Sequence, residues 1–328
     1  VITQDAARLA STQTTNGAVI VDGLVKTYPT PDGGEFNAVD GMHFTVEVGE
    51  VFGILGPNGA GKTTTLEIIE GVKRPTSGSA TVLGMDIGEN ARRISEVIGV
   101  QLQAASYFEH LRLGEILDLF GSFYEYALPA DRLLDMVGLL EKRNALVREL
   151  SGGQAQRFSI VAALVNDPKI VFLDEPTTGL DPQARRNLWE VIQHLNTDLG
   201  KTVVLTTHYM EEAEVLSHRV GIVDAGRMVT IDTPAGLIAG LGVGNRIEFG
   251  VHGPAPIESA EQLPGLLDIT PVVNGTVRYR ASVDAPNLAV PALYQWAQDH
   301  DTELVDVNVR SATLEDVFLA TTGKTLRD

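Results

Sequence analysis

The chain has 328 residues and a formal net charge of −18, with 25 Lys and Arg residues against 43 Asp and Glu residues. This acidic balance counts against nucleic acid as a partner, because a phosphate backbone is bound by basic side chains. The absence of cysteine excludes disulfides, thiolate catalysis and metal sites held by cysteine. The longest uninterrupted apolar run, 160–165, has six residues, whereas a membrane-spanning helix needs about 20.

The amino-terminal part of the sequence predicts a loosely ordered arm followed by antiparallel strands. Residues 1–17 lack apolar periodicity and show no basic cluster followed by an apolar segment, so we predict no secretory signal and expect a cytoplasmic location. Strand-like runs follow at 18–28 and 42–48, separated by a turn cluster at 29–34. The short apolar run 51–55 then leads into a glycine-rich loop and a helical segment.

The glycine-rich loop fits the phosphate-binding pattern GxxxxGK[ST] without deviation. Its glycines let backbone N–H groups converge on a phosphate at the start of a helix. Lys62 can reach the β and γ phosphates of a nucleotide, and the Thr63 hydroxyl can bind Mg²⁺. The loop and the first helical residues comprise Gly56, Pro57, Asn58, Gly59, Ala60, Gly61, Lys62, Thr63 and Thr64.

The middle of the chain predicts a helical subdomain at about 104–165, because apolar residues recur there at helical spacing. A second apolar strand, 170–173, ends in Asp174 and Glu175. At such a strand end Asp174 can hold Mg²⁺ through water, and Glu175 is placed to activate the attacking water as a general base. Strand, loop and helix recurring at a distance predict an α/β core that binds a nucleotide.

The carboxy-terminal part predicts a second domain that begins near Pro234. Six of the 15 prolines fall between Pro254 and Pro291, and short alternating runs return at 246–251, 277–283 and 304–309. Asn274-Gly275 is a hairpin signal, and 288–298 and 313–320 predict helices. We therefore expect a sheet domain over 18–234 and a small α+β domain over 235–328.

The segment Leu150 to Gln154 distinguishes this chain from most phosphate-loop proteins. Together with the phosphate loop and the acidic strand end, it resembles the nucleotide-binding domain of ATP-binding cassette (ABC) proteins. The resemblance implies an ATPase with bound Mg²⁺, in which this signature covers the γ-phosphate of the ATP held by the opposite protomer. A serine, two glycines and a helix amino terminus also make physical sense as an anion nest. The signature residues are Ser151, Gly152, Gly153 and Gln154.

The resemblance assigns three more residues by their position. Tyr28 stands where the family places an aromatic ring on adenine. Asp181, in the segment 178–181, matches the loop that links the two active sites across the dimer. His208 follows an apolar strand and matches the switch histidine that contacts the γ-phosphate. The other six histidines have no metal-ligand spacing and predict packing or surface roles.

Two glutamines fit the family position that senses Mg²⁺ and signals to a membrane partner. The family register favours Gln103, and Gln101 stays open as the alternative. No catalytic position of the family is missing, so the resemblance implies an active ATPase. The implied metal site consists of Thr63, Gln103 and Asp174, and the implied catalytic residues are Lys62, Glu175 and His208.

Three further segments narrow the resemblance to the ATP-binding subunits of ABC-2 type exporters, the daunorubicin-resistance type included. They are 39–41, 71–78 and 313–319, the last a Leu-Glu-Asp helix for which Thr313 and Asp316 also predict an ordinary capping box. The implied protein is a homodimer of ATPase subunits on ABC-2 type membrane permease subunits, at the cytoplasmic face of the membrane. It would power efflux of a drug-like or lipid-like substrate through ATP-driven closure of the dimer.

The main alternative is a soluble ABC ATPase without a transport role, acting on ribosomes, chromosomes or iron–sulfur cluster assembly. Translation factors of this superfamily normally carry two cassettes in one chain, and chromosome-type relatives insert long coiled coils. Neither an internal repeat nor heptads are present here. A phosphate-loop kinase is disfavoured, because it would need neither the signature nor His208.

Overall fold

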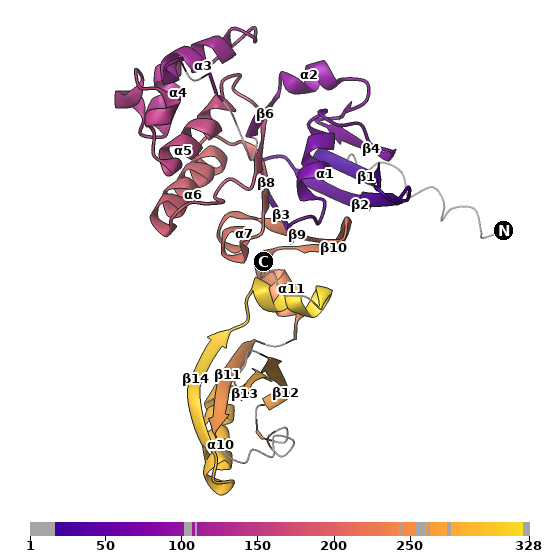
Figure 1. The fold of residues 1–328 in the computed structure, drawn as a ribbon, viewed down its shortest axis with the longest axis vertical. Helices are drawn as coiled ribbons and strands as arrows, with labels where there is room; N and C mark the ends of the chain where they lie inside the picture. Colours follow the sequence, from indigo (N-terminus) through magenta and orange to yellow (C-terminus); the bar gives the residue numbers. More distant parts are fainter. Residues whose placement is uncertain are drawn as a thin grey trace, which may run out of the picture. The chain divides into compact units, whose positions relative to one another are not determined.

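The computed structural model describes residues 17–101, 107–108, 110–242, 244–252, 260, 263–264, 266–273 and 277–323. The chain divides into two compact units, Val1–Thr230 and Ile231–Asp328 (Figure 1). The division falls inside strand β10, Arg227–Asp232, shortly before Pro234 opens helix α8, Pro234–Gly240. The arm predicted at 1–17 lies outside the described residues except for Gly17.

The first unit opens with a four-stranded antiparallel sheet in the order β2-β1-β4-β5. Strands β1 and β2 form a long hairpin in which β2 is an edge strand, while β1 also pairs with β4. Apolar side chains of β1 such as Val19 and Val21 are buried. The prediction of a β-rich start is confirmed. The strands are β1 Gly17–Pro29, β2 Glu35–Glu47, β4 Ser77–Val82 and β5 Met85–Asp86.

The centre of the unit is a six-stranded sheet in the order β10-β9-β3-β8-β7-β6. The neighbours from β9 to β6 pair in parallel, and every residue of β3, β7 and β8 is buried, as expected for a sheet covered on both faces. The carboxyl ends of β3, β8 and β7 therefore meet at one edge. The remaining bounds are β3 Val51–Leu55, β6 Ile98–Gln101, β7 Ile170–Asp174, β8 Thr202–Thr207 and β9 Arg219–Asp224.

Helices α3 to α6 gather on one side of this sheet, and α1 lies on the other (Figure 1). Buried side chains of these four helices, among them Leu117, Leu133, Phe158 and Ile192, share one apolar core with the strand residue Leu205. The α/β core with a helical region is as predicted. The helices are α1 Lys62–Ile69, α2 Ala91–Ser95, α3 Leu113–Gly121, α4 Ala130–Met136, α5 Gly152–Ala162, α6 Pro182–Thr197 and α7 Met210–Leu216, with short 3₁₀ turns at Leu140–Lys142 and Val147–Glu149.

The second unit is a small α+β domain, as the sequence predicts. Its antiparallel sheet has the order β12-β13-β11-β14. Helix α10 covers one face and buries Leu293 and Trp296 against Ile247 and Phe249. The predicted Asn274-Gly275 turn lies outside the described residues. The elements after α8 are β11 Asn245–His252, β12 Leu266–Val273, β13 Val277–Val283, α10 Pro286–Asp299, β14 Glu303–Ser311 and α11 Leu314–Thr322.

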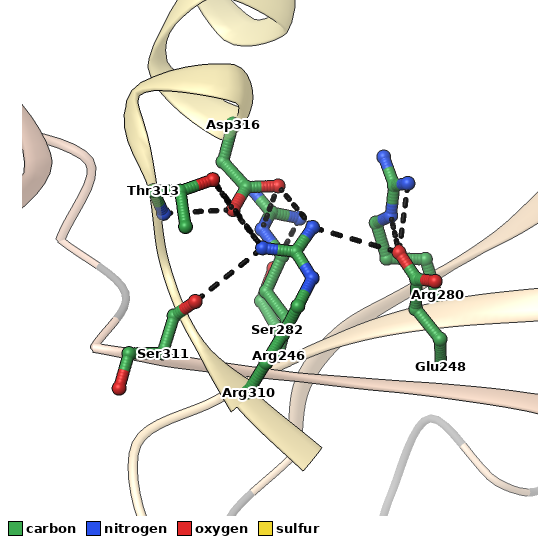
Figure 2. Close-up of polar contacts among 8 residues, drawn as sticks. All are labelled: Arg246, Glu248, Arg280, Ser282, Arg310, Ser311, Thr313 and Asp316. Carbon is green, nitrogen blue, oxygen red and sulfur yellow. Dashed lines mark hydrogen bonds and ion pairs between the residues drawn. The ribbon is translucent and has the colours of Figure 1, made fainter. Parts of the chain in front are cut away.

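The other face of this sheet carries charged residues that hold the start of α11 (Figure 2). The Asp316 carboxylate is 1% exposed and accepts two hydrogen bonds from Arg310, at 2.7 and 3.1 Å. Arg246 Nε lies 3.0 Å from the same carboxylate, and the Thr313 N–H donates to it at 3.0 Å. Burial alone would raise the pKa of Asp316, but these partners outweigh burial and lower it. The charged carboxylate thus ties α11 to the sheet.

Candidate active site

The phosphate loop lies between β3 and α1, at the edge where the parallel strands end. Gly59 and Gly61 have φ values of 79° and 97°, a left-handed conformation that side chains disfavour. A Cβ atom at Gly61 would lie 2.2 Å from the Ala38 carbonyl oxygen, and one at Gly56 would lie 2.3 Å from the carbonyl oxygen of Val223. The glycines are therefore needed both for the turn and for the close approach of neighbouring backbone.

Lys62 is buried at the centre of the site. Its Nζ atom donates to the carbonyl oxygens of Gly56 and Pro57 at 2.8 and 3.1 Å. It also forms an ion pair with Glu175, whose Oε1 atom lies 3.1 Å away. The two side chains are only 4% and 7% exposed, so this is a pair shielded from solvent. The loop carbonyls and Glu175 together fix the ammonium group at the loop.

Glu175 follows β7 directly and has a φ of 46°, which is unusual for a residue with a side chain. Such backbone strain persists where the surrounding structure imposes it, often at functional sites. The Glu175 N–H donates to Thr206 Oγ1 at 2.9 Å, and Glu175 Oε2 accepts from Thr178 Oγ1 at 3.1 Å. His208 Nδ1 lies 3.0 Å from the same Oε2 atom.

The surroundings of Glu175 favour its ionised form. Burial raises the pKa of this carboxyl, but the charge and hydrogen bond of Lys62, the His208 ring and the Thr178 hydroxyl outweigh burial. The net effect lowers the pKa of Glu175. Glu175 is therefore ionised at neutral pH, as a residue that accepts a proton must be.

Asp174 lies one residue earlier and faces the start of α1. Its Oδ1 atom accepts from Thr63 Oγ1 at 3.2 Å and from Thr206 Oγ1 at 2.5 Å. Burial, followed by the nearby charge of Glu175, raises the pKa of Asp174 above its usual value. A hydroxyl and a carboxylate oxygen side by side are the donor types that Mg²⁺ takes in nucleotide sites, where phosphate and water supply its other ligands. Among the described residues, no group of three or more His, Asp and Glu side chains could hold a metal ion.

The structure thus brings together the predicted residues Lys62, Thr63, Asp174, Glu175 and His208. The signature lies elsewhere: Ser151 caps α5, with its Oγ atom accepting from the Gln154 N–H at 3.4 Å. Asp181 caps α6 by accepting from two backbone N–H groups at 2.9 Å. The signature and Asp181 line one pocket of about 480 Å³, and neither Lys62 nor Glu175 is among its described lining residues.

Of the residues predicted to stack on adenine or to sense the metal, the structure describes Tyr28 and Gln101 but not Gln103. Tyr28 is half-buried, and the ammonium groups of Lys26 and Lys73 lie 5.3 and 5.9 Å from its ring centroid. Gln103 lies outside the described residues. Gln101 ends β6, is buried, and pairs in register with Leu173, next to the acidic strand end.

Sequence reasoning gave no role to Thr206, although its hydroxyl contacts both Asp174 and the backbone of Glu175. The signal was weak, a threonine at the end of an apolar strand. Tyr209 was also missed: its ring lies against the His208 ring, tilted by 41°, with centroids 4.1 Å apart. Its place directly after His208 was the available clue.

Comparisons with known proteins agree with this geometry. The family model described as ABC transporter matches residues 39–178. Nod factor export ATP-binding protein I of Paraburkholderia xenovorans (strain LB400) is 38% identical over 316 residues, covering 95% of this chain and 99% of that protein. The daunorubicin resistance ATP-binding protein DrrA3 of Streptomyces coeruleorubidus is 36% identical over 313 residues, covering 93% and 96%.

A solved structure with the same fold is the dimeric ATP-binding cassette MJ0796 in a post-hydrolysis state bound to ADP and Pi. Its TM-score is 0.59 at 27% identity, over 66% of this chain and 98% of that one. The residues that the family model matches, 39–178, include the phosphate loop, the signature and the acidic strand end. The chain therefore belongs to the ABC transporter family and is an ATPase of the ATP-binding cassette type.

Proposed function

We propose that this ATPase is the energy-supplying subunit of an ABC-2 type exporter and powers efflux of a drug-like or lipid-like substrate through separate membrane subunits. The observation that carries the hydrolytic role is the buried contact of Glu175 with both Lys62 and His208. Export is supported by the names of the two relatives, Nod factor export and daunorubicin resistance, which the chain matches over nearly their full length. Neither relative's name supports the alternative of a soluble ATPase without a transport role.

The nucleotide is held by the loop from Gly56 to Thr64, whose backbone N–H groups and helix dipole favour phosphate. Lys62 exchanges its contact with Glu175 for the β and γ phosphates, and Tyr28 stacks on the adenine. Thr63, and Asp174 through water, would hold Mg²⁺, with Gln103, or Gln101 in the alternative register. When bound, Mg²⁺ neutralises phosphate charge and orients the phosphoryl group.

Hydrolysis depends on the chain's own proton acceptor. Glu175 takes the proton of the attacking water, because it is the ionised carboxylate that points at Lys62 and therefore at the bound phosphates. His208, 3.0 Å from Glu175 Oε2, orients this carboxylate and contacts the γ-phosphate from the side of β8. The lysine stabilises the charge that develops on the transferred group.

The complete site requires a second copy of the chain. The pocket lined by Ser151 to Gln154 and by Asp181 has neither Lys62 nor Glu175 among its described lining residues, which supports the arrangement that the family resemblance implies, with this pocket covering the ATP bound by the partner protomer. ATP binding closes the homodimer and hydrolysis reopens it. The dimeric solved cassette bound to ADP and Pi supports this arrangement.

The transport path belongs to other subunits. Among the described residues, no helix is long and apolar enough to cross a membrane. We place the contact with an ABC-2 type permease, at the cytoplasmic face of the membrane, near residues 107–111. There the apolar side chain of Phe108 is 58% exposed. The neighbouring Tyr107 ring packs edge-on against the core residue Phe158, with ring centroids 5.2 Å apart, and so attaches this segment to the helical region.

The test is ATPase activity of the purified chain against protein concentration, with and without the membrane protein that co-purifies from its host. A composite site predicts a rate per protomer that rises with concentration and rises again with the partner. Turnover that is independent of concentration would refute the dimeric site. A host in which no membrane protein co-purifies and the ATPase instead sediments with ribosomes would refute the transport role.

A further inference from the structure

The position of His208 depends on how helix α7 begins. His208 and Tyr209 connect the end of β8 to Met210, the first residue of α7. The Tyr209 side chain gives α7 no capping hydrogen bond, and its N–H donates instead to Thr207 Oγ1 at 2.9 Å. The backbone at the histidine is thus a short link between a buried strand and a helix of only seven residues. Contacts from outside this link must determine where the imidazole points.

Helix α6 packs beside α7 and supplies two such contacts. The Arg185 guanidinium lies 4.1 Å from the centroid of the Tyr209 ring, whose other neighbour is the His208 ring, also at 4.1 Å between centroids. Trp189 Nε1 donates to Glu212 Oε1 at 3.3 Å. Arg185 and Trp189 are four residues apart on α6 and lie on one face of it.

Both contacts are at least partly shielded from water. Trp189 and Glu212 are buried, so loss of the indole N–H leaves a carboxyl oxygen without this donor in a site that water does not reach. A guanidinium over a tyrosine ring is stronger when it is shielded from water, and Arg185 is partly buried. Together they fix α7 at both ends of its first turn, at Tyr209 and at Glu212.

We propose that Arg185 and Trp189 are positioning residues for His208, which hold the imidazole against Glu175 through Tyr209 and Glu212. Asp181 caps the same helix, so α6 joins the loop that faces the partner protomer to the histidine of its own site. This inference rests on the proposed role of His208.

The experiment measures single-turnover hydrolysis of γ-labelled ATP, together with ATP binding and thermal unfolding, for Arg185→Gln and Trp189→Phe. We expect each variant to hydrolyse ATP about tenfold more slowly, with ATP affinity within about twofold of the unchanged chain. Arg185→Lys keeps a cation for the ring and is expected to recover most of the rate. Arg186→Gln makes the same charge change one residue on, at an exposed position, and is expected to leave the rate unchanged.

The decisive comparison repeats the Arg185→Gln and Trp189→Phe changes in a His208→Ala background. If both residues act through the histidine, neither change slows hydrolysis further there. A further tenfold loss in that background, or a loss explained by weaker ATP binding, would overturn the inference while leaving the role of His208 intact. A His208→Ala chain with normal hydrolysis would instead refute that role, and the inference with it. If Arg185→Gln does not fold, Trp189→Phe alone decides, because the smaller ring still fills most of the buried space.

Discussion

Replacing Glu175 by Gln removes the proposed base and the countercharge of Lys62 in one step. General-base catalysis contributes about 10²- to 10⁴-fold, so kcat should fall by at least about 100-fold, or roughly 3 kcal/mol in the barrier. Glu175 and Lys62 are 7% and 4% exposed and 3.1 Å apart, and breaking a buried pair by removing one charge costs about 3 kcal/mol or more. The amide keeps part of the hydrogen bonding, so we expect a loss of about 2 kcal/mol.

In thermal unfolding without nucleotide, that loss corresponds to a Tm lower by roughly 4–8 °C for a unit of this size. ATP affinity should be unchanged or higher, because phosphate no longer competes with a carboxylate for Lys62. The pKa of Glu175 is lowered in the folded chain, so its stabilisation is present at neutral pH and is lost as the pH falls below the ordinary value of 4.5. The difference in Tm should therefore shrink in acid.

The assays are ATPase rate, binding of a fluorescent ATP analogue and thermal unfolding at pH 7 and pH 4. Glu190→Gln, the same chemical change at an exposed position of α6, serves as the control and should alter none of them. Turnover at the unchanged rate in Glu175→Gln would show that another group is the base. An unchanged Tm at pH 7 would show that the ion pair with Lys62 does not stabilise the folded chain.

Three further predictions follow from buried charges. Lys62→Ala should weaken ATP binding about 10- to 100-fold, because a charged hydrogen bond is worth about 1.5–3 kcal/mol, and unchanged affinity in a titration would count against its phosphate role. Asp316→Ala removes the buried carboxylate shared by Arg310 and Arg246, leaves Arg310 only the longer ion pair with Glu248, and should lower the unfolding temperature of the second unit by 10 °C or more, at about 3 kcal/mol. Asp306→Ala, at an exposed pair, should shift it little, and equal shifts in calorimetry would refute the argument. Burial, followed by neighbouring carboxylates, raises the pKa of Glu70 to about 8, so the first unit should lose stability as the pH rises from about 5 to 8. Glu70→Gln should flatten that dependence in thermal unfolding, and a profile identical to that of the unchanged chain would contradict it.

The sequence predicts the phosphate loop and the acidic strand end because their chemistry depends on short, local patterns. Lys62 has to follow a glycine at the start of a helix, and Asp174 has to end a buried strand. The contact between Glu175 and His208 is not local, because it exists only where β8 lies beside β7 in the sheet. A strand order of β3-β8-β7 cannot be deduced from chain order, so the family resemblance had to supply the histidine.

In the second unit, too, a local pattern predicts the helix but not its long-range contacts. Thr313 and Asp316 predict a capped helix, and the Thr313 N–H does donate to the Asp316 carboxylate. The larger role of Asp316, as the partner of Arg310 and Arg246, depends on the pairing of β11 with β14 across more than 60 residues of chain. A local pattern identified the helix, whereas its attachment to the sheet required the long-range pairing.

The geometry of the active site follows from the packing of the strands that carry it. In the parallel pair of β7 and β8, Asp174 lies opposite Thr206, which is why one threonine hydroxyl contacts both Asp174 and the backbone of Glu175. A slip of β7 by one residue along β8 would pair Asp174 with Thr207 in place of Thr206. It would also turn the Asp174 side chain to the other face of the sheet. Every residue of both strands is buried, so apolar packing opposes that slip. The positions of Glu175, the proposed base, and Asp174, the proposed metal ligand, are therefore set by the packing of the core strands. The position of His208 depends instead on the contacts between α6 and α7.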